Sequence, residues 1–172
     1  MNRNEIIEAL KSIQSDYKDY FISLFKERSD LYSIHIFIST ILNKALNIIE
    51  EFFNAFQNNN IFVIPALIRM QADNCMATYA LSVIDDDIHS VLIDILNGKK
   101  RIRDYKDFRT GKKLNDSYLH SSINNDFPKF SEMYEWACSF VHFSKYTINA
   151  SIKSIGDMGV EGRISSNNDK YD

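Results

Sequence analysis

The first 64 residues of this chain contain neither glycine nor proline. These two residue types are the strongest interrupters of regular structure, so a long stretch without them favours long helices over many short strands. Apolar residues recur within it at helical spacing, in two successive stripes. The sequence therefore predicts two long antiparallel helices, one over residues 4–26 and another from Leu31 onward, with Ser29 or Asp30 as the cap of the second.

A third helix is predicted over residues 61–84, where Pro65 suits the first turn because its missing N–H costs nothing there. The stretch is apolar around most of its circumference, as expected of a central helix that is packed on several sides. Arg69, Asp73 and Asn74 nonetheless lie inside it. Since Arg69 and Asp73 are one turn apart, we expect both to be mostly buried and bonded to each other or to the last helix.

Shorter elements are predicted in the second half of the chain. We expect helices over residues 86–96, over residues 116–123, and from residue 128 or 131 to Tyr146, followed by a hairpin with strands at 151–155 and 160–164. The predicted fold is all-α: one domain over residues 1–164, an antiparallel bundle of four main helices plus one or two short ones, with a small C-terminal hairpin or irregular tail. Residues 165–172 form a polar tail that we expect to be disordered.

Composition points to a cytoplasmic protein. Cys75 and Cys138 lie in helical patterns without metal-like spacing, which is typical of reduced thiols in the core of a protein. The chain starts without the apolar region of a signal peptide, and none of its uninterrupted apolar runs is long enough to cross a bilayer. The four histidines fall on different predicted elements, and neither a phosphate-binding glycine loop nor a CxxC pair occurs. We therefore predict no metal, no cofactor and no membrane association.

The most biased stretch is residues 99–113, called the basic segment below. It holds eight of the twenty Lys and Arg residues against two Asp, so it carries +6 while the rest of the chain carries −9. Tyr105 and Phe108 interleave these charges. One interpretation is a nucleic-acid site, in which cations contact phosphates and aromatic rings stack on bases; the candidate binding residues are then Lys99, Lys100, Arg101, Arg103, Lys106 and Arg109. The other is a solvated connection whose aromatic residues hold it to the body.

Three polar residues share one face of the last predicted helix: Glu135, Ser139 and His142. An acid, a hydroxyl and an imidazole are the parts of a base-activated nucleophile or a general acid–base site. An alternative is a structural histidine whose tautomer is fixed by the hydroxyl. His142, Ser139 and Glu135 are therefore candidate catalytic residues.

A resemblance rests on two stretches of the sequence. Residues 66–74 (Ala-Leu-Ile-Arg-Met-Gln-Ala-Asp-Asn) and residues 134–144 (Tyr-Glu-Trp-Ala-Cys-Ser-Phe-Val-His-Phe-Ser) resemble an uncharacterised bacterial family similar to the HEPN group of helical bundles. The resemblance covers about residues 62–164. It implies an up-and-down bundle, a homodimer and, in many members, metal-independent RNA cleavage in phage defence or toxin–antitoxin systems.

The HEPN catalytic motif is an arginine followed by four to six residues and then a histidine. At the matching distances before His142 this chain has Ala137, Trp136 and Glu135, so an arginine that serves His142 must come from another helix, and Arg69 is the candidate.

Two functions follow from the sequence. The first is an RNA-binding or RNA-cleaving protein in which His142 is the general acid–base and Arg69 stabilises a phosphate. Asp73 and Asn74 are then further binding residues, and the basic segment holds the RNA backbone. In that case the basic segment and His142 should lie on the same side of the bundle. The second is a non-catalytic adaptor, antitoxin or dimerisation module, with a partner protein encoded nearby, in which Arg69, Asp73 and His142 form a buried polar network. If the basic segment lies away from His142, the second function is favoured.

Overall fold

The computed structural model describes residues 2–26, 32–142, 144–156 and 159–162. Three long helices come first: α1 (Arg3–Phe25), α2 (Ser33–Gln57) and α3 (Val63–Ser82). Shorter elements follow: α4 (Ile88–Leu96), the 3₁₀ turn η1 (Ile102–Asp104), α5 (Asp116–Asp126), α6 (Phe130–Val141), α7 (Lys145–Ala150) and the strands β1 (Ile152–Gly156) and β2 (Gly159–Gly162). The predicted helical fold class is confirmed, and the two strands pair as an antiparallel hairpin.

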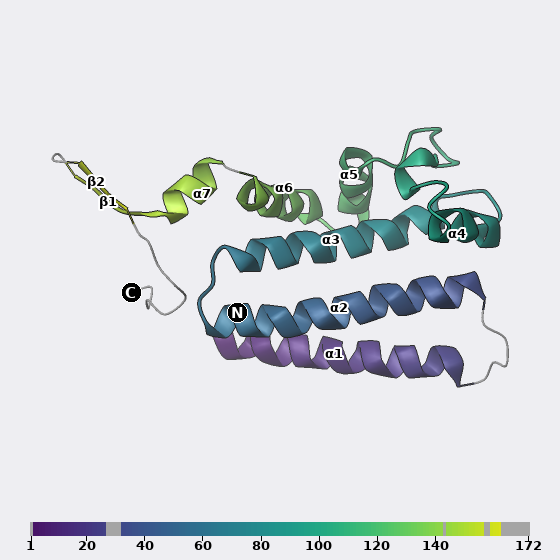
Figure 1. Cartoon of the computed structure of the whole chain (residues 1–172), viewed down its shortest axis with the longest axis horizontal. Helices are drawn as coiled ribbons and strands as arrows, with labels where there is room; N and C mark the ends of the chain where they lie inside the picture. The colour runs from purple at the N-terminus through teal and green to yellow at the C-terminus, as the bar shows by residue number, and fades with distance from the viewer. Residues whose placement is uncertain (1, 27–31, 143, 157–158, 163–172) are drawn as a thin grey trace.

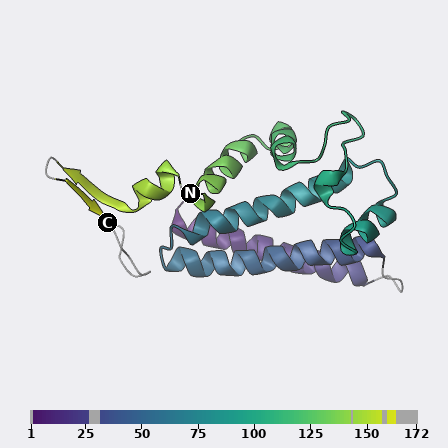
Figure 2. The same ribbon diagram turned by 45° about the horizontal axis from the view of Figure 1, so that its top comes forward.

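Helix α3 is the central element. It packs against α2 on one side and against α5 and α6 on the other, while α1 packs against α2 (Figure 1). Consecutive long helices run in opposite directions, and α6 runs antiparallel to α3. Beyond α6, helix α7 and the hairpin extend away from the other helices in both views (Figures 1 and 2).

Local sequence explains where α3 begins. Asn59 adopts a left-handed conformation with φ of 51°, which asparagine tolerates better than most residues, and this turn ends α2. Pro65 then occupies the first turn of α3, where it lacks no intrahelical bond, and it is buried.

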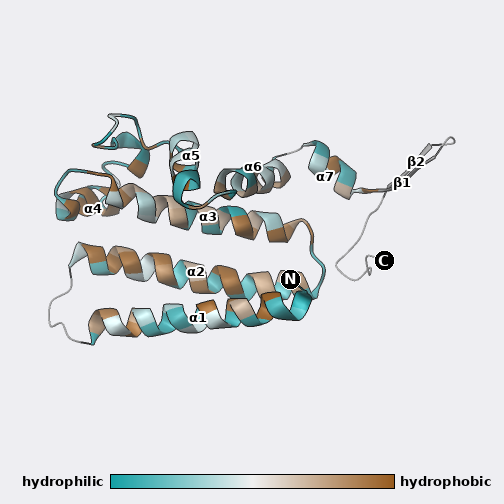
Figure 3. Ribbon diagram, turned by 180° about the vertical axis from the view of Figure 1, so that it is seen from behind, coloured by the Kyte–Doolittle hydropathy of each residue, from teal (hydrophilic) through white to brown (hydrophobic). Residues whose placement is uncertain are grey.

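The core divides unevenly among the helices. A large cluster joins α3, α4, α5 and α6 through Met76, Ala80, Val91, Leu119 and Tyr134. A smaller cluster joins α2 and α3. In contrast, α1 has no buried residue. Apolar residues dominate α2, whereas α1 mixes polar and apolar residues along its length (Figure 3).

The last predicted helix is interrupted, so its predicted extension to Tyr146 is wrong. Helix α6 ends at Val141, His142 has extended backbone angles, and α7 begins only at Lys145. Hydroxyl groups explain the break: Ser144 Oγ donates to the Ser139 carbonyl at 2.6 Å and accepts from the next helix, which satisfies groups that a continuous helix would have paired itself.

Helix boundaries elsewhere also differ from the prediction. Helix α2 begins at Ser33 with Tyr32 at its N-cap position, so the predicted cap at Ser29 or Asp30 is displaced, and both of those residues lie outside the described part. Helix α5 continues to Asp126, three residues further than predicted. The predicted tail at 165–172 lies outside the described residues.

Candidate functional site

The Arg69 guanidinium joins three helices. It pairs with Asp73 one turn along α3. Its Nε donates to Cys138 Sγ of α6 at 2.9 Å, and one Nη donates to Asp116 Oδ2 at the start of α5 at 3.3 Å. The guanidinium also lies over the Tyr134 ring, 4.2 Å from its centroid, where a cation is attracted to the face of the ring. Arg69 therefore holds α3, α5 and α6 together.

These contacts confirm the predicted bonding of Arg69 to Asp73 and to the last long helix. The prediction that both members are mostly buried is wrong for Asp73, whose side chain is 42% exposed, against 18% for Arg69. Asp73 keeps part of its hydration because it lies on the outer side of the pair. Asn74, a predicted binding residue, is buried, and its amide donates to Gln71 at 3.1 Å.

Tyr134 completes this network on the α6 side. Its hydroxyl donates to Asp116 Oδ2 at 3.2 Å, and its ring stacks on that of His120 at 4.8 Å. Burial raises the pKa of Tyr134 well above its usual range, although the nearby Arg69 charge acts in the opposite direction. The phenol therefore stays protonated and serves as a donor.

The predicted catalytic residues do not come together. Ser139 Oγ donates to the Trp136 carbonyl of its own helix at 2.5 Å and makes no hydrogen bond to His142. Because α6 ends at Val141, His142 leaves the helical face that it was predicted to share with Glu135, and both residues are exposed. Arg69 is committed to Asp73, Asp116 and Cys138, and within the described residues it makes no bond to His142.

The basic segment is a fixed loop with a buried interior side. Tyr105 and Asp107 are buried while Lys106 and Phe108 point outward, and Leu114 closes the loop from beyond its end. Backbone bonds hold this alternation: Asp107 N donates to the Lys112 carbonyl at 2.9 Å, and Phe108 N donates to the carbonyl that follows α3 at 3.0 Å. The predicted aromatic attachment therefore applies to Tyr105 only.

Asp107 is the organising residue of this loop, and its side chain is fully buried. Its carboxylate accepts from the Arg109 backbone at 2.7 Å, from the Arg109 Nη2 at 2.8 Å and from the Tyr118 hydroxyl of α5 at 2.7 Å. The Arg109 side chain holds the pKa of Asp107 well below its usual range despite the burial, with the Tyr118 hydroxyl acting in the same direction. Arg109, predicted to bind nucleic acid, is thus engaged in the loop itself and donates to Tyr79 of α3 at 3.0 Å.

The remaining cations of the segment differ in their partners. Lys99 and Lys100 lie within 3.8 Å and 3.7 Å of Asp94, and Arg101 lies 3.4 Å from Asp104. Four cations form no ion pair with any residue that the structure describes: Arg103, Lys106, Lys112 and Lys113. Phe108, which belongs to the same segment, is 57% exposed.

The basic segment and His142 lie at opposite ends of α3. The segment packs along the C-terminal half of α3, where Arg109 donates to Tyr79 and the Phe108 amide donates to the carbonyl of Val83, the residue that follows the helix. The end of α6 packs at the N-terminal half, where Arg69 contacts Cys138 one turn before His142 (Figure 1). Both lie on the same face of α3, the one turned away from α2 (Figure 1), but toward its two ends, because α6 runs antiparallel to α3. That one bound strand reaches both stays a prediction.

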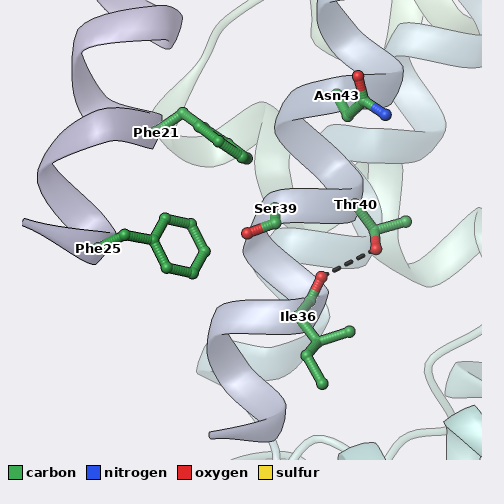
Figure 4. A pocket seen from close by; sticks show the side chains of 6 residues that line it. All are labelled: Phe21, Phe25, Ile36, Ser39, Thr40 and Asn43. Atoms are coloured by element: carbon green, nitrogen blue, oxygen red, sulfur yellow. Dashed lines mark hydrogen bonds between the residues drawn. The ribbon is translucent and has the colours of Figure 1, made fainter. Parts of the chain in front are cut away.

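A groove between α1 and α2 is the second surface feature. It measures about 480 Å³, and Figure 4 shows the rings of Phe21 and Phe25 on α1 facing Ser39 and its neighbours on α2. Its lining residues are Phe21, Phe25, Ile36, Ser39, Thr40 and Asn43. Ser39 Oγ is buried and has no hydrogen-bond partner among the residues that the structure describes, whereas Thr40 Oγ1 donates to the Ile36 carbonyl at 2.8 Å.

Sequence reasoning missed the residues that organise these sites. Asp107 looked like one charge in a solvated run, and only its place between the apolar Tyr105 and Leu114 could have signalled burial. Asp116 follows Asn115, a typical cap, and was visible only as the start of a helix. Tyr134 and Cys138 belong to the stretch used for the resemblance, but their contacts depend on tertiary structure. The predicted core position is wrong for Cys75, which is exposed on α3, and Cys138 is half-buried.

Comparisons with family models, curated proteins and solved structures found no match for this chain. None of the helices in the described part is long and apolar enough to span a membrane. Within that same part, no group of three or more His, Cys, Asp or Glu side chains is placed to hold a metal ion.

Proposed function

We propose that this protein is a non-catalytic helical module that self-associates through the α1–α2 hairpin. The observation that carries the proposal is that α1, a helix of 23 residues with an apolar stripe, has no fully buried residue and leaves five large apolar side chains exposed: Ile13, Tyr20, Phe21, Ile22 and Phe25. In a helical bundle the apolar stripe of a helix is normally covered, because its burial supplies most of the stability of the helix. A covering surface outside the single chain accounts for the stripe.

A second copy of the chain fits this surface. Helix α1 carries three Lys and Arg residues against four Asp and Glu, so two copies meet with almost balanced charge rather than strong repulsion. The groove also places apolar rings beside the Ser39 hydroxyl, which has no hydrogen-bond partner within the described part of the chain. Such a mixture of apolar and polar groups suits a symmetric contact in which each copy presents both.

The proposal includes the finer architecture. Helices α1, α2, α3 and α6 are taken as the four main helices of an antiparallel bundle similar to the HEPN group. The exposed face of the α1–α2 helix pair is taken as its dimer interface. What supports this is the order of packing, in which α1 lies on α2, α2 on α3 and α3 on α6. The polar network around Arg69 then has a structural role, fixing how α5 and α6 sit on α3.

The test is the oligomeric state of the whole chain. Size-exclusion chromatography with light scattering should give a dimer at micromolar concentration, and a Phe21→Ser/Phe25→Ser double variant should give a monomer. Phe127→Ser is the matched control, because Phe127 is an exposed phenylalanine between α5 and α6 and should leave the dimer intact. A monomeric parent chain, or a double variant that remains dimeric, would contradict the proposal.

A second candidate function is RNA binding without cleavage by the basic segment. It is favoured by one observation: Arg103, Lys106, Lys112 and Lys113 have no ion-pair partner among the described residues and belong to the same fixed loop as the exposed Phe108. Its affinity should fall with salt by about one unit of log–log slope for each phosphate contact.

Incubation with total RNA and tRNA in the presence of EDTA, beside His142→Ala, tests the cleavage that the HEPN resemblance implies. Cleavage by the parent chain that His142→Ala abolishes would restore the catalytic interpretation. Binding without cleavage would support the second candidate.

A further inference from the structure

A cleft of about 410 Å³ lies between the C-terminal half of α3, the end of α4, the first part of the basic segment and the start of α5. This volume lies within the range of small-molecule sites. The cleft is separate from the groove between α1 and α2, whose lining residues all belong to those two helices.

The floor of the cleft is apolar and fixed. Met76 of α3, Leu119 of α5 and Leu114, which precedes α5, all line it and are all buried in the body of the protein. Ala77 and Ile102 add apolar walls. A thioether beside branched aliphatic side chains is a good surface for a flat ring, since sulfur makes favourable contacts with aromatic groups.

Cations and carboxylates both line the cleft. Lys100, Arg101 and Arg103 come from the basic segment, and Asp73 and Asp116 come from α3 and α5. Lys100 and Arg101 have acidic neighbours, but Arg103 is exposed and forms no ion pair with any described residue. Arg103 is therefore available to an anionic group, and a guanidinium suits the bidentate geometry of a phosphate.

The two carboxylates are held in place and keep free acceptors. Arg69 binds Asp73 Oδ1 and Asp116 Oδ2, and Tyr134 also donates to Asp116 Oδ2. Asp73 Oδ2 and Asp116 Oδ1 accept no hydrogen bond from the residues that the structure describes. These oxygens can accept from hydroxyl or amino groups of a ligand, and Arg69 keeps their orientation.

From this combination we infer that the cleft binds a nucleoside monophosphate. The base lies on the floor around Met76, the phosphate meets Arg103 with Arg101 beside it, and the sugar hydroxyls or exocyclic amine donate to Asp73 and Asp116. The same chemistry is presented by a free nucleotide and by one nucleotide of an RNA strand. The inference does not rest on self-association, because neither α1 nor α2 contributes a residue to the lining of the cleft.

Isothermal titration calorimetry of the full chain with AMP tests this assignment, with adenosine and inorganic phosphate as partial probes. AMP should bind saturably, and each partial probe should bind at least about tenfold more weakly because it loses one half of the contacts. Absence of saturable AMP binding would overturn the inference.

Two variants and a matched control place the ligand. Arg103→Ala removes the unpaired cation, and Ala77→Leu fills the cleft without changing charge; each should weaken AMP binding by about tenfold or more. Lys106→Ala removes another exposed cation, one that does not line the cleft, so it should change affinity by less than about twofold. Equal losses in Arg103→Ala and Lys106→Ala, with none in Ala77→Leu, would show attraction to surface charge and would overturn the inference.

Competition with a short oligoadenylate separates the two sources of the ligand. An oligonucleotide that displaces AMP and is itself weakened by Ala77→Leu assigns the cleft to a nucleotide within a strand. An oligonucleotide that leaves AMP bound assigns it to the free nucleotide.

Discussion

Helix α1 contributes 23 residues and buries none of them, whereas the basic segment has only one 3₁₀ turn and buries Tyr105 and Asp107, with Leu114 buried just beyond it. Regular secondary structure therefore does not mark the part of this molecule that is held most firmly. What holds the basic segment is side-chain burial and a satisfied carboxylate, and what α1 lacks is a surface on its second side. The basic segment is therefore fixed by its own contacts, whereas α1 keeps an apolar face that a partner can cover.

The largest expected difference comes from leucine truncation in the two regions. Leu114→Ala should lower the free energy of unfolding by about 3–4 kcal/mol, because Leu114 is 1% exposed and its removal leaves a cavity. Leu10→Ala, in the middle of α1, should cost only about 1 kcal/mol because the side chain is partly exposed. Urea unfolding at dilute concentration measures both, and equal costs would remove the contrast between the regions.

Removal of the Asp107 carboxylate is the next test. Asp107→Ala should cost roughly 2–4 kcal/mol, since it leaves the Arg109 and Tyr118 donors without their acceptor while Arg109 keeps some hydration. Asp104→Ala, which removes an exposed pair with Arg101, is the control and should cost less than about 1 kcal/mol. A thermal melt of Asp107→Ala that matches Asp104→Ala would show that the loop is held by other contacts.

Acid stability follows from the same carboxylate. The folded-state pKa of Asp107 lies below its unfolded value of about 3.9, so its contribution is present above that pH and is lost as the pH falls toward the folded value. Between about pH 4 and pH 2 the parent chain should therefore lose more stability than Asp107→Asn, which has no such proton to bind. Parallel stability curves for the two proteins over that range would contradict the assignment.

The smallest effect separates the members of the Arg69 network. Arg69→Ala should cost about 2 kcal/mol because it removes contacts to three helices at a mostly buried position. Asp73→Ala should cost about 1 kcal/mol or less, since its side chain is 42% exposed and Asp116 remains as a partner for Arg69. If chemical denaturation gives a larger loss of unfolding free energy for Asp73→Ala than for Arg69→Ala, then Asp73, and not Arg69, is the energetically more important member of the pair.

Sequence reasoning reached the long elements because they depend on local signals. The stretch without glycine or proline and the position of Pro65 are signals that lie within the helices themselves, and the corresponding helices are present. The interruption after Val141 was missed because it depends on Ser144, a hydroxyl residue that competes with the helix only once its donor reaches a carbonyl.

The site was less accessible to prediction than the fold. A charge pattern gives the identity of Arg69 and Asp73 but not their exposure, which depends on where α5 and α6 lie. The face shared by Glu135, Ser139 and His142 exists only if the helix continues, and it ends at Val141. Asp107 shows the opposite case: it belongs to a charged run, yet among the described residues it is the most buried carboxylate, because Tyr118 of α5 and Arg109, which also contacts α3, pack against it.

Hydrogen–deuterium exchange at two protein concentrations tests the central contrast most directly. At low concentration the amides of α1 should exchange faster than those of Asp107, Phe108 and Leu114, which are bonded within or next to the fixed loop. At high concentration protection of α1 should rise, because a second copy covers it, while the loop amides should not change. Protection of α1 equal to that of the loop at both concentrations would contradict the account.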